Sequence, residues 1–203
     1  MAWAKLDSGM PISLVGMPGG GKSTVGRHLA RHLHRRFFDA DVEVERRLGC
    51  PIRLFFEREG ETSFRDIEEE VLADLVTRSD AVLATGGGAV LREANRRALR
   101  RGGTVVYLRS TPEELFRRLR RDTHRPLLQV GDPLRKLRDL HAERDPLYRA
   151  TAHFIIETGR PSVHTLVNTV LMQLELAGIV GIQDPSSASR ESLPPAEPPG
   201  FQT

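Results

Sequence analysis

The 203-residue sequence predicts an α/β fold, in which a parallel sheet of about five strands is covered by helices on both faces. Short apolar runs alternate with segments whose apolar residues recur every three or four positions, as expected for strands that alternate with helices. A glycine-rich loop follows the first apolar run. The chain is long enough for one well-buried domain and too short for two of ordinary size. Ligands of such sheets bind at the carboxyl ends of the strands.

The first elements surround the glycine-rich loop, residues 16–23, which fits G-x-x-x-x-G-K-[ST] at every fixed position. Residues 12–15 read as a buried strand, and apolar residues recur every four positions over 25–33, as on one face of a helix. The pattern predicts a phosphate-binding loop. Lys22 would reach the β- and γ-phosphates, and the Ser23 hydroxyl would be a ligand of Mg²⁺, because this hard cation prefers oxygen.

The second predicted strand, residues 36–39, ends in a carboxylate, and a second carboxylate follows at Asp41. Two interpretations of this pair remain open. In an extended segment, Asp39 and Asp41 would point to the same side. Alternatively, Asp39 would be the N-cap of a helix that includes residues 42–48. The local sequence favours neither interpretation.

Residues 51–79 are predicted to be mostly helical, with Gly60 separating an earlier helix from a later one. Arg65 and Glu68 are three residues apart, so they neighbour each other on one helical face and could pair. Most pairs of this kind are solvated surface pairs.

A short buried strand is predicted at residues 81–84, and Thr85 with three glycines, residues 86–88, follows at its carboxyl end. A turn needs one or two glycines, so three in succession indicate a backbone that approaches a ligand closely. A loose connecting loop is the alternative interpretation.

The second half of the chain continues the alternation. Thr111 and Glu114 form a capping box with Pro112 between them, which predicts a helix start. Periodicity fails over residues 122–132, which we expect to be a lid. The other predicted elements are helices over 92–101, 133–144 and after the cap Ser162, and strands over 104–108 and 153–158.

The chain is expected to comprise one domain, residues 1–180, and a disordered tail, residues 181–203. From residue 183 onward the tail contains five prolines and four serines with few large apolar groups, so it lacks the apolar surface needed for ordered packing.

Composition narrows the function. The formal net charge is only +3, with 27 acidic residues interspersed among 30 basic ones, which argues against nucleic acid as a partner. Cys50 is the only cysteine, so an internal disulfide and a cysteine-based zinc site are excluded. We find no signal-peptide pattern and no apolar run long enough to cross a membrane. A cytoplasmic protein without a membrane partner is expected, and a monomer is favoured because no apolar stripe remains after the core helices are assigned.

The phosphate-binding loop alone does not distinguish motors, switches and kinases. The Asn-Lys-x-Asp and Asp-x-x-Gly segments of GTPase switches are missing from the sequence. A motor-type ATPase would usually be larger, and it would carry an acidic pair where residues 85–88 lie. A small-molecule kinase therefore remains.

Several segments together resemble the shikimate kinase family. In chain order they are residues 16–23, 39–41, 64–65 with Glu68, 86–88, 125–128 and 144–148. The resemblance covers residues 10–176. It implies a P-loop kinase fold with a lid, and an enzyme that uses ATP and Mg²⁺ to phosphorylate the 3-hydroxyl of shikimate on the route through chorismate to aromatic amino acids.

The resemblance also implies roles for individual residues. Asp39 would hold Mg²⁺ with Ser23, and Asp41 would contact the shikimate hydroxyls. Arg65 and Arg144 would hold the substrate carboxylate, with Glu68 orienting arginine. The catalytic residues implied are Lys22, Asp41 and Arg125, the last from the lid. The implied substrate-binding residues are Asp41, Arg65, Gly86, Gly87, Gly88 and Arg144. The nucleotide-binding residues are Gly19, Gly20, Gly21, Lys22, Ser23, Thr24, Arg118 and Arg160, although Arg117, Arg120 and Arg121 permit another register for Arg118.

Two other functions compete with this one. A gluconate kinase of the same group would take a sugar acid in place of shikimate, but the triple glycine and the Phe64-Arg65 segment argue against it. A nucleotide-binding regulatory module without catalysis is the alternative outside enzymes. The presence of Lys22, Ser23 and both aspartates makes that module the weaker hypothesis.

Overall fold

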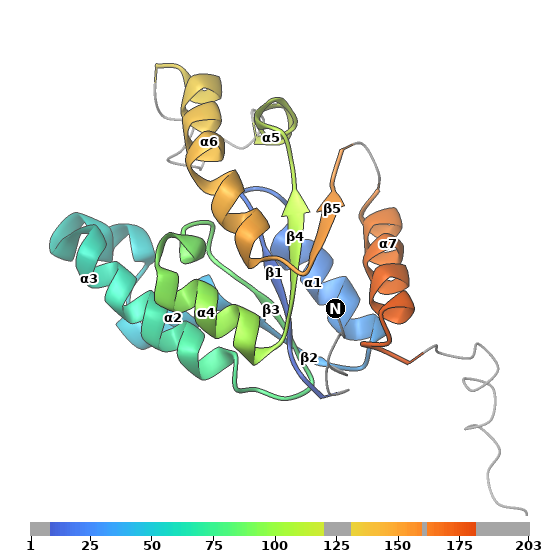
Figure 1. Ribbon diagram of the computed structural model, residues 1–203. Helices are drawn as coiled ribbons and strands as arrows, with labels where there is room; N and C mark the ends of the chain where they lie inside the picture. Colours follow the sequence, from blue (N-terminus) through green and yellow to red (C-terminus); the bar gives the residue numbers. More distant parts are fainter. Residues whose placement is uncertain (1–8, 120–130, 160–161, 182–203) are drawn as a thin grey trace, which may run out of the picture.

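The computed structural model describes residues 9–119, 131–159 and 162–181. Five parallel strands form one sheet in the order β2-β3-β1-β4-β5 (Figure 1). The strands are β1 (Ile12–Val15), β2 (Arg36–Asp39), β3 (Ala81–Ala84), β4 (Thr104–Arg109) and β5 (Phe154–Glu157). The predicted fold class is therefore confirmed.

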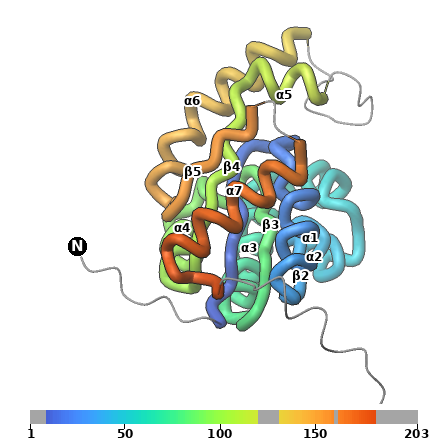
Figure 2. Tube along the Cα trace, turned by 90° about the vertical axis from the view of Figure 1, so that its right-hand side faces the viewer, coloured from blue at the N-terminus to red at the C-terminus, as the bar shows by residue number. Residues whose placement is uncertain are grey.

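Helices cover both faces of this sheet. They are α1 (Lys22–His32), α2 (Ala40–Leu48), α3 (Ile52–Leu75), α4 (Glu93–Gly102), α5 (Pro112–Leu119), α6 (Pro133–Thr151) and α7 (Val163–Leu176), with a short 3₁₀ helix η1 (Ala89–Leu91). Figure 2 shows α1 and α7 side by side on one face. The other helices lie on the opposite face.

Two apolar cores hold these layers together, because successive strand residues point to opposite faces. In β1, Ile12 and Leu14 pack with α1 and α7, whereas Val15 packs in the core beneath α2 to α6. In β3, Val82 and Leu83 divide between the two cores in the same way. A central strand that is buried on both faces is typical of a parallel sheet.

Local signals placed several element ends correctly. Gly60 interrupts α3 with φ 80° and ψ 176°, as predicted. The capping box is present: the Thr111 N–H donates to Glu114 Oε2 at 3.0 Å, and the Glu114 N–H donates to Thr111 Oγ1 at 3.3 Å. Ser162 caps α7 by accepting from the Thr165 N–H.

Helix α6 is longer than predicted, since it continues past residue 144 to Thr151 with Pro146 inside it. A proline interrupts the helical hydrogen bonding. The turn beyond it is stabilised by burial of Tyr148, whose ring stacks on Tyr107 with a centroid separation of 4.9 Å. The predicted helix 92–101 begins at Glu93, because Arg92 has an extended backbone after η1, which was not predicted.

Most of the predicted lid, residues 122–132, and of the tail, residues 181–203, lies outside the described residues. Gly131, Asp132 and Gly181 are described, and Asp132 is the N-cap of α6. Within the described ranges, no helix is both long and apolar enough to span a membrane.

His153 joins the beginning of β5 to β4 by two hydrogen bonds. Its backbone N–H donates to Val105 O at 2.8 Å, and its Nδ1 accepts from the Val105 N–H at 2.9 Å. Burial, followed by the charge of Arg100, lowers the pKa of His153. The unfolded chain therefore takes up a proton below about pH 6.5, where the folded chain does not. This contribution to stability is complete above that pH and is lost as pH falls through the window below it.

We accordingly expect the melting temperature of the protein to fall by a few degrees more between pH 7.5 and 5.5 than that of His153→Asn, whose side-chain oxygen accepts without titrating. Differential scanning calorimetry at several pH values measures the difference. His28→Asn, which changes an exposed histidine of α1, is the control and should behave as wild type. Parallel curves for wild type and His153→Asn would contradict the prediction.

Candidate active site

The glycine-rich loop connects β1 to α1, and its geometry depends on particular glycines. Gly21 is the N-cap of α1 with φ 88°, and Gly19 has φ 77°, both in the left-handed region that favours glycine. Lys22 opens the helix and is only 8% exposed. Its Nζ donates to the carbonyls of Gly16 at 2.9 Å and Met17 at 3.0 Å. The ammonium thus lies over its own loop, where phosphate oxygens would compete for it.

A cavity of about 450 Å³ opens beside this loop, where β1 and β3 end. Its lining residues are Pro18, Gly19, Gly21, Lys22, Ser23, Thr24, Asp41, Thr85 and Gly87. Most of the predicted phosphate-binding residues therefore share one cavity with Asp41 and with Gly87 of the triple glycine. Gly20 does not line the cavity, because it is buried within the loop and its N–H donates to Met17 O at 3.0 Å.

The two aspartates take different positions. Asp39 is the N-cap of α2, and its Oδ1 accepts from the Asp41 N–H at 3.2 Å. The helical interpretation of this segment is therefore correct, and the extended one is wrong. Asp41 lies in the first turn of α2 and faces the cavity. Asp41 is accessible to solvent, but desolvation by the surrounding protein raises the pKa of its carboxyl, and the nearby Lys22 charge opposes that rise.

The donor set near the loop suits Mg²⁺. Across the described ranges, no three His, Cys, Asp or Glu side chains gather as a ready-made metal site. Mg²⁺ does not require such a cage, because it usually keeps several waters and binds one or two protein oxygens together with substrate phosphates. The Ser23 hydroxyl lies on the cavity wall, and the Asp39 carboxylate at the end of β2 is hydrogen-bonded to the N–H of the cavity residue Asp41, so both are oxygens of the kind that Mg²⁺ binds.

The triple glycine is required because side chains press against it. A β-carbon on Gly86 would stand 2.6 Å from Asp41 Oδ1 and 2.8 Å from Glu68 Oε1. On Gly88 it would collide with the Arg65 guanidinium, and on Gly87 with Pro18. None of the three glycines has a positive φ. The sequence predicted a close approach of this backbone to a ligand, which stays a prediction, and the close neighbours that the structure shows are protein side chains.

Arg65 and Glu68 form a buried pair. Arg65 Nη1 donates to Glu68 Oε2 at 2.6 Å, and the two side chains are 12% and 2% exposed. Glu61 is a further acceptor for Arg65 at 3.0 Å. Burial raises the pKa of Glu68, and the charge and hydrogen bond of Arg65 oppose that rise. The interpretation as a solvated surface pair is therefore wrong.

Arg144 reaches the same glycine loop from α6. Its Nη1 donates to Gly87 O at 3.2 Å, and its side chain is 13% exposed. Arg144 Nε is buried and has no hydrogen-bond acceptor among the described residues. Two guanidinium groups, from α3 and α6, thus lie against consecutive residues of one loop, beside the cavity that holds Lys22.

Three predicted arginines remain, and the structure describes one of them, Arg118. Arg118 Nη2 donates to the carbonyls of Thr158 at 2.7 Å and Gly159 at 2.9 Å, which ties α5 to the end of β5. Its neighbour Leu119 lies against Gly19, so this helix end adjoins the phosphate-binding loop. Arg125 and Arg160 lie outside the described residues.

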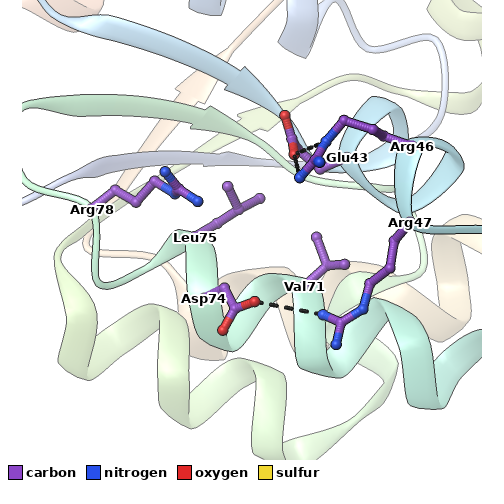
Figure 3. A pocket seen from close by; sticks show the side chains of 7 residues that line it. All are labelled: Glu43, Arg46, Arg47, Val71, Asp74, Leu75 and Arg78. Atoms are coloured by element: carbon purple, nitrogen blue, oxygen red, sulfur yellow. Dashed lines mark hydrogen bonds and ion pairs between the residues drawn. The ribbon is translucent and has the colours of Figure 1, made fainter.

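A second hollow, between α2 and α3, is not part of this site (Figure 3). Its volume of about 40 Å³ is close to that of one water molecule. Two of its three arginines are also paired within it, Arg46 to Glu43 at 2.9 Å and Arg47 to Asp74 at 3.5 Å. The hollow is too small for a nucleotide or a sugar acid.

Sequence reasoning missed three residues behind the glycine loop. Tyr148 donates its hydroxyl proton to Gly87 O at 2.5 Å. The ring of Tyr107 stacks on it, and the Tyr107 hydroxyl donates to Asp145 Oδ1 at 2.8 Å. In the sequence, Asp145 and Tyr148 stood out only as members of the segment 144–148, with no role of their own. The one available signal was Tyr107, a polar aromatic residue inside a strand that was predicted to be apolar.

Comparisons with known proteins agree with this geometry. The family model described as shikimate kinase matches residues 18–175. A shikimate kinase of Burkholderia thailandensis is 57% identical over 174 residues, covering 86% of this chain and 95% of that protein. The structure of shikimate kinase from Acinetobacter baumannii in complex with shikimate has a TM-score of 0.78 and 48% identity, covering 86% of this chain and 96% of that one. A gluconokinase from Sinorhizobium meliloti, with a TM-score of 0.56, 16% identity and coverage of 83% and 93%, shares the fold alone.

Proposed function

The chain belongs to the shikimate kinase family, and from that premise we propose which of its residues carry the ATP-dependent phosphorylation of shikimate. The reaction transfers the γ-phosphoryl group of ATP to the 3-hydroxyl of shikimate and leaves ADP. One observation supports the assignment most strongly. The two largely buried arginines that lie against Gly87 and Gly88 adjoin the cavity lined by Lys22, so the proposed carboxylate and phosphate sites would be neighbours.

The nucleotide side of the site would be the glycine-rich loop. Backbone N–H groups of the loop bind phosphate oxygens, and Lys22 neutralises charge on the β- and γ-phosphates. Ser23 and Asp39 would hold Mg²⁺, which supplies positive charge to the transferring group when it is bound. We assign Thr24 to the same loop, and Arg118 and Arg160 to the adenine. Arg125 would close over the phosphates from the lid.

The acceptor side would lie along the glycine loop. Arg65 and Arg144 would bind the planar carboxylate of shikimate, because guanidinium groups match its geometry with paired hydrogen bonds. Glu68, through its 2.6 Å hydrogen bond, fixes the orientation of Arg65. Asp41 would orient the reacting hydroxyl and accept its proton. We further propose that the enzyme works in the cytoplasm as a monomer, which size-exclusion chromatography with light scattering tests directly.

The carboxylate assignment predicts a selective defect. In Arg65→Ala, the KM for shikimate should rise roughly 10- to 150-fold, because hydrogen bonds to charged groups are typically worth about 1.5–3 kcal/mol. The KM for ATP should stay within twofold. Arg65→Lys should also be impaired, since an ammonium keeps the charge and loses the planar fork. Each substrate is titrated separately while the other is saturating.

The matched control is Arg97→Ala, which removes an arginine paired with Glu93 at 3.1 Å on the exposed surface of α4. It should leave both KM values unchanged, because exposed pairs of this kind contribute little. If Arg65→Ala weakens ATP and shikimate equally, or weakens neither, the carboxylate site has been misplaced.

A further inference from the structure

The Gly87 carbonyl accepts hydrogen bonds from two side chains of α6. Arg144 Nη1 donates at 3.2 Å and the Tyr148 hydroxyl at 2.5 Å. The two donors are four residues apart, so they lie one above the other on the same face of the helix. Only Arg144 has a role in the function proposed above. The second donor therefore needs an explanation.

Tyr148 is a fixed donor. Its side chain is fully buried, and its ring is held against Tyr107 by stacking. Burial raises the pKa of Tyr148, so the hydroxyl keeps its proton throughout the neutral range. Next to Arg144, Asp145 is in turn bound by Arg149 at 2.6 Å and Arg109 at 3.1 Å. This part of α6 is thus bound to β4 through Asp145 and to the glycine loop through Tyr148.

Arg144 is the looser of the two donors. Its bond to Gly87 O is longer than the usual 2.9 Å of an N–H···O bond. Its buried Nε makes only a 3.9 Å ion pair with Glu143 and has no hydrogen-bond acceptor among the described residues, so the guanidinium has a hydrogen bond still to make. A carboxylate would offer the guanidinium an oppositely charged partner and two parallel N–H···O bonds, whereas the neutral Gly87 carbonyl accepts only one. A carboxylate at this position would therefore draw Arg144 away from Gly87.

We propose that Tyr148 is a positioning residue that frees Arg144 to bind the carboxylate of the acceptor. When Arg144 turns to the substrate, the partly buried Gly87 carbonyl keeps its bond from Tyr148. Without the Tyr148 hydroxyl, the same movement leaves that carbonyl unpaired, and the cost is subtracted from substrate binding. This inference rests on the proposed role of Arg144 in carboxylate binding.

Tyr148→Phe keeps the ring and removes the hydroxyl. We expect the KM for shikimate to rise roughly 5- to 20-fold while the KM for ATP stays within twofold. Tyr107→Phe is the matched control, because it removes a hydroxyl from the other ring of the same stack. Asp145 still accepts from Arg109 and Arg149 in that variant, so the KM for shikimate should stay within twofold of wild type.

A double-mutant cycle with Arg144→Ala separates this inference from the proposed function. Arg144→Ala alone should raise the KM for shikimate, and adding Tyr148→Phe should raise it no further, since no arginine remains to be released. If Arg144→Ala leaves that KM unchanged, the proposed carboxylate site is wrong. If Arg144→Ala raises it, three results would overturn the role of Tyr148: a KM within twofold in Tyr148→Phe, equal effects on both substrates, or additive effects in the double variant.

Discussion

Replacing Lys22 by alanine should lower kcat for shikimate phosphorylation by about 10³-fold. Phosphoryl transfer depends almost entirely on positioning and on charge stabilisation, and removal of a single well-placed donor typically costs 10²- to 10³-fold. Among the described residues that line the cavity, Lys22 is the one lysine, and its ammonium is already held beside the phosphate-binding loop by the carbonyls of Gly16 and Met17. Steady-state kinetics with both substrates saturating measures the loss.

Two further variants distinguish lost charge from lost structure. Lys22→Met keeps most of the aliphatic stem that fills the buried position, so its kcat should fall as far as that of Lys22→Ala while its melting temperature falls less. Lys136→Ala removes an exposed lysine of α6 and should behave as wild type. A kcat within tenfold of wild type in Lys22→Met would contradict the assignment of Lys22 to the phosphates.

Asp41→Asn should lower kcat by about 10²-fold or more with little change in fold. The substitution keeps the shape that fits against Gly86 and removes the proton acceptor, and general-base groups typically contribute 10²- to 10⁴-fold. Because transition states of phosphoryl transfer are generally loose, Asp41 contributes through orientation as well as through proton acceptance. Circular dichroism and the melting temperature verify the fold.

The pH profile gives a second measurement on the same residue. Asp41 acts only when it is ionised, so kcat/KM should decline as pH falls through its pKa. Desolvation by the surrounding protein raises that pKa, which moves the decline to a higher pH than an ordinary aspartate would give. Asp41→Asn should lose this limb of the profile, whereas Asp74→Asn, an exposed site on α3, should keep it. Near-normal activity in Asp41→Asn would exclude the proposed role.

Much of the fold could be predicted because its signals are local. The capping box at Thr111, the break at Gly60 and the phosphate-binding loop each depend on residues a few positions apart. The start of α2 was undecided because Asp39 suits both a strand end and an N-cap. Packing decides it, since Ala40 and Val44 are both buried in the core. The continuation of α6 past Pro146 depends on contacts with β4, which local sequence does not contain.

The candidate site likewise has parts that local sequence predicts and parts that depend on tertiary contacts. The phosphate-binding residues share one loop, so their sequence predicts their shape. Glu68 is buried beside Gly86, which is distant in sequence. On an isolated helix the pair of Glu68 with Arg65 would lie on the surface, so the local sequence does not predict its burial. Tyr107 and Tyr148 face one another from β4 and α6, and only the tertiary structure shows that the second hydroxyl reaches Gly87.

The strand order has a consequence for how the protein acquires its activity. The β1 strand is central, and its Ile12 pairs with Val82 on one side and Thr104 on the other, both far downstream. Gly16 of the phosphate-binding loop also packs against Leu108 O at the end of β4. A growing chain therefore carries the whole nucleotide-binding motif long before the neighbouring strands of β1 exist. Such non-local pairing slows folding, and ATP binding during refolding will report completion of the sheet rather than its beginning.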